Sequence, residues 1–195
     1  MNKEELKTRR IIEDIKRFVE QECKKPSSHY SYEIYFCHFI PMVAHAKNLA
    51  RSYKLGEVDM GIVELAAWLH DIGSIMCGRK DHHITGTKIA EKKLRELGYS
   101  NEKIQKVKEC IYCHRGSQDI VRKSKEAQII ADADTISAFD NLSGLFKAAI
   151  FDEGLNQVQA KASVKQKLLN SWEKLSVNAK DIIRTKYEAA MILLE

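Results

Sequence analysis

The apolar residues of this chain recur at helical spacing along almost its whole length. Within residues 4–23, for example, Ile11, Ile15 and Val19 recur at every fourth position and so fall on one face of a helix. Only two prolines and nine glycines interrupt the sequence, and strands are hard to place in it. The pattern predicts an all-α protein, a single-domain helical bundle over residues 1–195.

Local sequence signals predict where several of these helices begin and end. Pro41 is tolerated in a first helical turn, so a helix is expected from there to a stop near Gly56. Asp59 is the expected N-cap of the next helix, MGIVELAAWLH, which is apolar on nearly every side. That helix should lie in the middle of the bundle, and the pair His70 and Asp71 closes it.

Beyond this pair we expect a polar loop, SIMCGRKDHH, followed by more helices. Ser100 is the expected N-cap of one of them, and Gly144 and Gly154 are expected breaks nearer the C-terminal end. The remaining helices are predicted at 84–97, at 101–113, from Ser124 onward and, as two or three elements, across 142–195.

Length, composition and charge set limits on this picture. A chain of 195 residues with 44% hydrophobic and 30% charged residues has room for one folded domain with a sizeable core. The charge of +5 is scattered, so it gives little reason to expect a nucleic-acid partner. The first twenty residues hold no apolar run of the kind that a signal peptide or membrane span needs, so we expect a cytoplasmic protein without a membrane partner. The helices of 142–195 would serve equally to close the bundle or to form a homodimer.

The five cysteines fit reduced thiols better than a disulfide framework, because their number is odd and their spacing irregular. Cys110, Cys113 and His114 form the CxxCH pattern of a c-type haem attachment site. Haem attachment needs an exported chain, however, and the pattern lies inside an expected helix. We therefore expect both cysteines to pack in the core.

Histidine and aspartate residues carry the candidate chemistry. A His–Asp pair at the end of an apolar helix is an unusual pair to bury, although such a pair also arises by chance or as a helix cap. Neutral imidazoles and carboxylates gathered from several helices can hold one or two divalent metals in a bundle. The candidate ligands in chain order are His38, His70, Asp71, His82, His83, His114, Asp132 and Asp134.

Roughly residues 33–140 resemble the HD superfamily of metal-dependent phosphohydrolases. The segment ELAAWLHDIGS is similar to the signature that names the family, and HFIPMVAHAKNLA resembles its first motif, with a ligand at His38. HHITGTKIAEKKL resembles the helix that supplies a further His in two-metal members, IYCH matches the next motif, and IIADADTIS matches the terminal Asp motif. The resemblance implies an HD-type core over 33–140 and accessory helices over 142–195.

The resemblance also implies a set of metal ligands, for one or two ions of Mn, Fe, Co, Ni, Zn or Mg. His82 is an alternative to His83 by a one-residue shift, and Asp132 is expected to orient a ligand histidine rather than to bind the metal. The implied ligands are His38, His70, Asp71 and Asp134 for the first ion, and His83 and His114, with Asp71 as a bridge, for the second.

The activity implied by the resemblance is phosphoester hydrolysis, by a phosphomonoesterase or a phosphodiesterase acting on a nucleotide or a related small phosphorylated molecule. A metal-activated water would attack phosphorus, with Asp71 orienting that water or accepting its proton. Lys88 and Arg115, which follow ligand histidines, are expected to meet the phosphate. Two alternatives stay open: a di-iron oxygenase with the same ligands, and a non-catalytic regulatory module that keeps the metal for structure.

Overall fold

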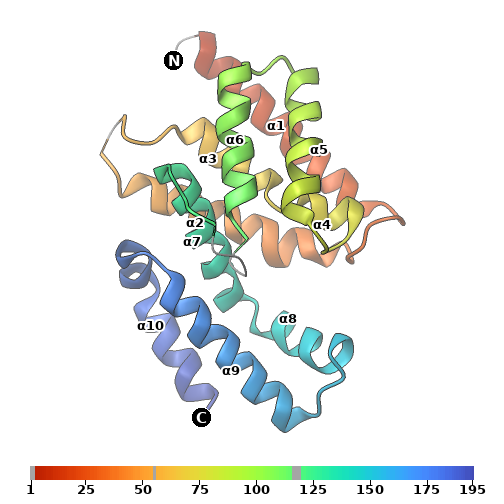
Figure 1. Cartoon of the computed structure of the whole chain (residues 1–195), viewed down its shortest axis with the longest axis vertical. Helices are drawn as coiled ribbons and strands as arrows, with labels where there is room; N and C mark the ends of the chain where they lie inside the picture. Colours follow the sequence, from red (N-terminus) through yellow and green to blue (C-terminus); the bar gives the residue numbers. More distant parts are fainter. Residues whose placement is uncertain (1–2, 55, 116–119) are drawn as a thin grey trace.

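The structure, a computed structural model, describes residues 3–54, 56–115 and 120–195, and every regular element within them is helical (Figure 1). The all-α prediction is therefore confirmed. In chain order the elements are α1 (Lys3–Lys24), the π-helical turn η1 (Tyr35–Phe39), α2 (Ile40–Arg51), α3 (Met60–Leu69), α4 (Ile72–Cys77), α5 (His82–Glu96), α6 (Asn101–Cys113), α7 (Lys125–Asp140), α8 (Leu142–Lys147), the π-helical turn η2 (Ala148–Asp152), α9 (Gln157–Lys174) and α10 (Val177–Leu193).

Helix α3 lies in the middle of the bundle, in contact with α1, α2, α6 and α7. Ile62 and Leu69 are fully buried there. As predicted, the carboxylate of Asp59 caps the helix, accepting a hydrogen bond from the backbone N–H of Gly61 at 2.9 Å. The stretch Met60–Cys77 is long and apolar enough for a membrane span, but 67% of it is buried inside the bundle, as in a core helix.

Helices α4 and α5 approach each other closely at a pair of glycines. A Cβ atom added at Gly73 would lie only 2.2 Å from the carbonyl oxygen of His82 and 2.7 Å from the backbone nitrogen of Gly86. Glycine at position 73 therefore permits the close approach, which brings Asp71 next to the first turn of α5. The polar loop predicted after Asp71 is wrong in its first half, because buried Ile75 and its neighbours fold as α4.

Most of the other predicted helix ends agree with the structure. Ser100 and Ser124 accept hydrogen bonds from backbone N–H groups in the first turns of α6 and α7. Gly154, with φ of 68°, lies between η2 and α9, but Gly144 lies inside α8, so a break there was wrongly predicted. As predicted, Pro41 lies in the first turn of α2, into which η1 runs directly, but the helix ends at Arg51 rather than near Gly56.

The C-terminal helices α8, α9 and α10 lie to one side of the other helices and join them mainly through α7 (Figure 1). Asp132 on α7 accepts hydrogen bonds from the backbone nitrogen of Ser176, at 3.2 Å, and from its hydroxyl, at 2.6 Å. Asp140 at the end of α7 is paired with His45 of α2 and Lys186 of α10. These polar links fix α10 against the helices that carry the candidate site.

Candidate metal centre

Six histidine and aspartate side chains meet in one region of the bundle, although only two of them are adjacent in the sequence. The packing of four helices, the junction between α3 and α4, and one π-helical turn therefore assembles the group, and π-helical turns are frequent at functional sites. The six are His38 (η1), His70 (end of α3), Asp71 (between α3 and α4), His82 (start of α5), His114 (end of α6) and Asp134 (α7).

The first half of the group contains His38, His70 and one oxygen from each aspartate. The Nε2 atoms of the two histidines lie 2.9 Å apart. Asp71 Oδ2 lies 3.6 Å from the Nε2 of His38 and 3.9 Å from that of His70. Asp134 Oδ1 lies 3.7 Å and 3.6 Å from the same two atoms. Two imidazole nitrogens and two carboxylate oxygens thus face one small space.

The second half contains His82 and His114, on the other oxygen of Asp71. The Nε2 atoms of these histidines lie 3.2 Å apart. Asp71 Oδ1 lies 3.3 Å from the Nε2 of His82 and 3.7 Å from that of His114. The hydroxyl of Ser74 donates a hydrogen bond to the same Oδ1 at 3.0 Å. Asp71 therefore presents one oxygen to each histidine pair.

Hydrogen bonds fix which ring nitrogen of each histidine carries the proton. In His70, His82 and His114 the Nδ1 atom lies 2.8, 2.9 and 2.5 Å from a backbone carbonyl oxygen three residues earlier. A carbonyl oxygen only accepts, so Nδ1 carries the hydrogen and Nε2 keeps a lone pair. The Nδ1 of His38 lies 3.1 Å from the hydroxyl of Ser137, which donates its own hydrogen to a backbone carbonyl, so this Nδ1 is also a donor.

Four Nε2 lone pairs consequently point at one another and at two carboxylates. Facing acceptors repel each other unless a proton or a cation lies between them. Neutral imidazoles and carboxylates are the ligands that Mn, Fe, Co, Ni and Zn take in proteins. The donor set present in the chain therefore fits one or two divalent cations that share Asp71.

The close charges also shift the pKa values within the group. Burial alone would raise the pKa of Asp71, but the facing imidazoles of His114 and His38 hold it well below its usual range. The pKa of Asp134 is likewise lowered against the effect of burial, chiefly by His70. Burial would lower the pKa of His38, but the two carboxylates outweigh it and raise that pKa. The group thus favours positive charge at its centre.

The structure corrects the expectation that His83 belongs to the second half. Neighbouring residues of an α-helix point about 100° apart, so only one of the two adjacent histidines can face Asp71. That residue is His82. His83 instead packs against the ring of Tyr112, with centroids 5.3 Å apart, and its Nδ1 lies 3.3 Å from Nη1 of Arg115. Burial, and then the charge of Arg115, lower the pKa of His83.

The two cations expected to meet a phosphate differ in position. Arg115 directly follows His114, and its side chain is half-buried beside His83. Lys88 is exposed on α5, six residues beyond His82, which turns it by about 240° from the face that carries that histidine. Within the described residues, no hydrogen bond or ion pair joins Lys88 to the group. The structure therefore does not bring Lys88 to the site.

The expectation for Asp132 is also corrected. Its carboxylate is bonded to Ser176 and contacts none of the candidate histidines among the described residues, so it does not orient a ligand. The side chain that does so is Ser137, which the sequence reasoning missed. Its place on α7, one turn after Asp134, was the only available signal.

Cys110 and Cys113 are buried free thiols, as expected for core residues. Burial raises the pKa of both, which disfavours the reactive thiolate. His114, the third member of the CxxCH pattern, faces Asp71. Core packing explains the two cysteines, and the candidate metal centre explains His114, so the CxxCH pattern does not require haem.

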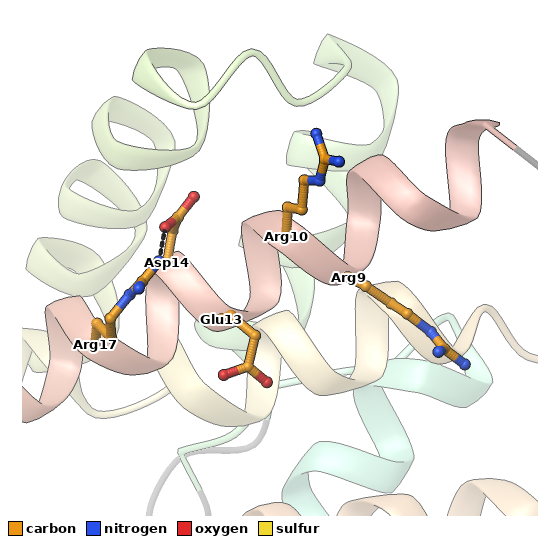
Figure 2. A pocket seen from close by; sticks show the side chains of 5 residues that line it. All are labelled: Arg9, Arg10, Glu13, Asp14 and Arg17. Carbon is orange, nitrogen blue, oxygen red and sulfur yellow. Dashed lines mark hydrogen bonds and ion pairs between the residues drawn. The ribbon is translucent and has the colours of Figure 1, made fainter.

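Two surface depressions lie away from this group. One, of about 430 Å³, runs along the outer face of α1 (Figure 2). Figure 2 shows that Arg10 and Glu13 point away from each other while Asp14 pairs with Arg17, so these side chains do not converge on a common ligand position. Another depression lies mainly between α1 and the start of α3 and includes none of the six grouped residues.

Comparisons with known proteins agree on one family. Residues 35–138 match the family model described as the HD domain. The solved structure of an HD-superfamily hydrolase from Bacillus thuringiensis is similar, with a TM-score of 0.73 and 19% identity over 96% of this chain and 94% of that chain. At this identity the likeness establishes the fold alone. No curated protein sequence shows a significant match.

Proposed function

This chain belongs to the HD domain family, and on that premise we propose that it is a metal-dependent phosphohydrolase acting on a nucleotide or a related small phosphorylated molecule. The observation that carries the proposal is the convergence of four Nε2 lone pairs on the two oxygens of Asp71. Buried acceptors packed this closely need positive charge among them. The description of the Bacillus thuringiensis relative as a hydrolase supports the same assignment.

The two halves of the group would each hold one divalent cation. When bound, such a cation lowers the pKa of water and neutralises charge on a phosphoryl oxygen. The chain orients its imidazoles beforehand, because three of them are already bonded through Nδ1 to backbone carbonyls. The residues that would hold the first cation are His38, His70, Asp71 and Asp134, and those for the second are Asp71, His82 and His114.

Asp71 has the bridging role in this proposal. Each of its oxygens faces a different histidine pair, and Ser74 restrains Oδ1. A carboxylate whose pKa is held so low is a weak base. We therefore assign Asp71 to fixing the spacing of the two halves and orienting water, rather than to accepting a proton.

The substrate phosphoryl group would approach from the carboxylate side of the group. The side chains of Asp71 and Asp134 are 26% and 29% exposed, whereas those of His70 and His114 are 0% and 2% exposed. Water and small anions therefore reach the carboxylates but not the far sides of His70 and His114. Arg115, beside the second half, supplies the nearby positive charge that stabilises a phosphoryl transition state.

The test is release of phosphate or nucleoside from a panel of nucleotides and phosphodiesters with added manganese. The wild type is compared with Asp71→Ala and with Asp181→Ala, which removes an exposed carboxylate on α10. Release by the wild type and Asp181→Ala, but not by Asp71→Ala, is expected. Release by Asp71→Ala at the wild-type rate, or no release from any substrate, argues against the proposal.

The same proteins separate the alternative functions. Tightly held iron together with oxygen consumption, and without phosphate release, would favour a di-iron oxygenase. A metal-dependent rise in thermal stability without any turnover would favour a non-catalytic regulatory module.

A further inference from the structure

We propose that His83 is a positioning residue, which holds the guanidinium of Arg115 so that it binds a phosphoryl group beside the His82–His114 half of the centre. The inference rests on the proposed function, because it assigns the part of the site that takes the negative charge of the substrate. It also gives a role to a buried histidine that the metal centre does not use.

His83 is buried but turned away from the metal-binding candidates. It is only 2% exposed, and its ring packs against Tyr112 of α6. The ring of His82, with its centroid 5.9 Å away, occupies the direction toward Asp71. A buried imidazole needs partners for its polar atoms, and the partner of Nδ1 is the guanidinium of Arg115 at 3.3 Å.

The direction of this hydrogen bond follows from the chemistry of the two groups. A guanidinium only donates, so Nδ1 of His83 accepts and the ring hydrogen lies on Nε2. This is the reverse of His70, His82 and His114, whose Nδ1 atoms donate to carbonyl oxygens. With Nδ1 occupied and Nε2 protonated, neither ring nitrogen of His83 can bind a metal ion. In this tautomer His83 can accept a hydrogen bond from a cationic side chain through Nδ1.

Asp81 holds Arg115 from a second direction. Its Oδ1 lies 3.8 Å from Nη1 of Arg115, and it sits directly before α5 with φ of 53°. The Asp81 side chain is 54% exposed, so solvent weakens this ion pair. Asp81 therefore helps to orient the guanidinium, and the side chain of Arg115 itself keeps 25% exposure.

The position of Arg115 directs this charge at the second half of the centre. Arg115 directly follows His114, and its Nη1 contacts His83 and Asp81, the two residues on either side of His82 in the chain. A planar guanidinium matches two oxygens of a phosphoryl group, and one that is already oriented loses less side-chain entropy on binding. The ammonium group of a lysine at this position would supply the charge without the planar pair of donors that matches two phosphoryl oxygens.

Inorganic phosphate is the probe, and its affinity for the manganese-loaded protein is measured by calorimetry. His83→Phe keeps an aromatic ring against Tyr112 but removes the acceptor, and we expect about tenfold weaker binding. His83→Asn loses the ring, but its Oδ1 takes the place of Nδ1, so affinity within about threefold of the wild type is expected. Lys88→Ala removes an exposed cation from the same helix and should change nothing. All three variants should bind as much manganese as the wild type.

Several results would overturn the proposal. Unchanged phosphate affinity in His83→Phe, or equal weakening in the Phe and Asn variants, would show that the acceptor is not what matters. Loss of manganese in either variant would show that His83 binds the metal. Arg115→Lys provides a second comparison, because it keeps the positive charge but not the planar guanidinium. Wild-type affinity in Arg115→Lys, or no phosphate binding by the wild type, would equally exclude this subsite.

Phosphate binding requires no turnover, so this test is separate from that of hydrolysis. A protein that hydrolyses nothing but binds phosphate through His83 and Arg115 would refute the proposed activity and leave this pair standing. A protein that hydrolyses its substrate but is indifferent to His83→Phe would refute the pair alone.

Discussion

Replacing Gly73 with alanine tests how a helix crossing builds the metal centre. The added Cβ would lie 2.2 Å from the carbonyl oxygen of His82 and 2.7 Å from the backbone nitrogen of Gly86. Both distances are far inside van der Waals contact, and the atoms belong to backbone that cannot rotate away. Helix α5 must therefore shift by about 1 Å relative to α4.

The cost of this shift follows from the two opposing effects of the methyl group. Overpacking against backbone destabilises by about 3 kcal/mol, at the upper end of the usual range. The higher helix propensity of alanine offsets about 1 kcal/mol of that loss, so the net loss is about 2 kcal/mol. For a chain of this length, such a loss lowers Tm by about 4–8 °C. Manganese affinity should fall as well, because α5 carries His82 away from Asp71.

Thermal unfolding followed by circular dichroism, together with bound manganese, measures both effects. Gly86→Ala is the matched control, because the tightest contact of its Cβ would be with the Cγ2 atom of Ile111, at 3.3 Å, while the nearest backbone atoms lie at ordinary contact distances of 3.5 and 3.7 Å. This side chain can give way, so Tm should stay within about 2 °C of the wild type. If Gly73→Ala keeps the wild-type Tm and manganese content, the crossing does not set the spacing of Asp71 and His82.

Three further predictions concern metal binding and the C-terminal helices. Manganese at about 100 times its Kd should raise the unfolding free energy by about 2.7 kcal/mol, and with it Tm, and a chelator should reverse the rise. A Tm that neither manganese nor the chelator changes would argue against a metal site in the folded protein. His82→Ala should lose manganese from the second half while His83→Ala keeps it, and equal loss would reverse the assignment of these two residues. Asp140→Asn should lower the unfolding free energy by about 1–2 kcal/mol at neutral pH, because hydrogen bonds with Lys186 and His45 outweigh burial and lower the pKa of Asp140. This stabilisation is complete above the unfolded-state pKa of about 3.9 and is lost as the pH falls through the lower folded-state pKa. Urea denaturation measures the difference in stability between the two proteins at each pH. A difference that stays the same below about pH 4 would contradict the prediction.

The helix ends could be predicted from the sequence because their signals are local. Asp59, Ser100 and Ser124 accept hydrogen bonds from backbone groups in the turn that each one begins, so a few residues of sequence contain the whole motif. Helix α4 was missed because so short a segment is not stable by itself. It becomes helical by packing against α5 at Gly73, a contact that no local pattern reveals.

The site could be predicted as a set of residue types, but not in all its contacts. The choice between His82 and His83 depends on the residue at which α5 begins and on its rotation about its own axis, which tertiary packing sets. The same rotation carries Lys88 away from the site. Asp132 was given the wrong partner because Ser176, to which it is bonded, lies 44 residues further along the chain.

Bound metal in the wild type and in Asp71→Ala tests the central claim most directly, namely that one carboxylate joins two histidine pairs around divalent cations. Each protein is loaded with manganese, desalted and analysed by mass spectrometry of the metal, with Asp181→Ala as the matched control. We predict that the wild type and Asp181→Ala retain manganese and that Asp71→Ala retains little. Wild-type manganese content in a folded Asp71→Ala protein would contradict the claim.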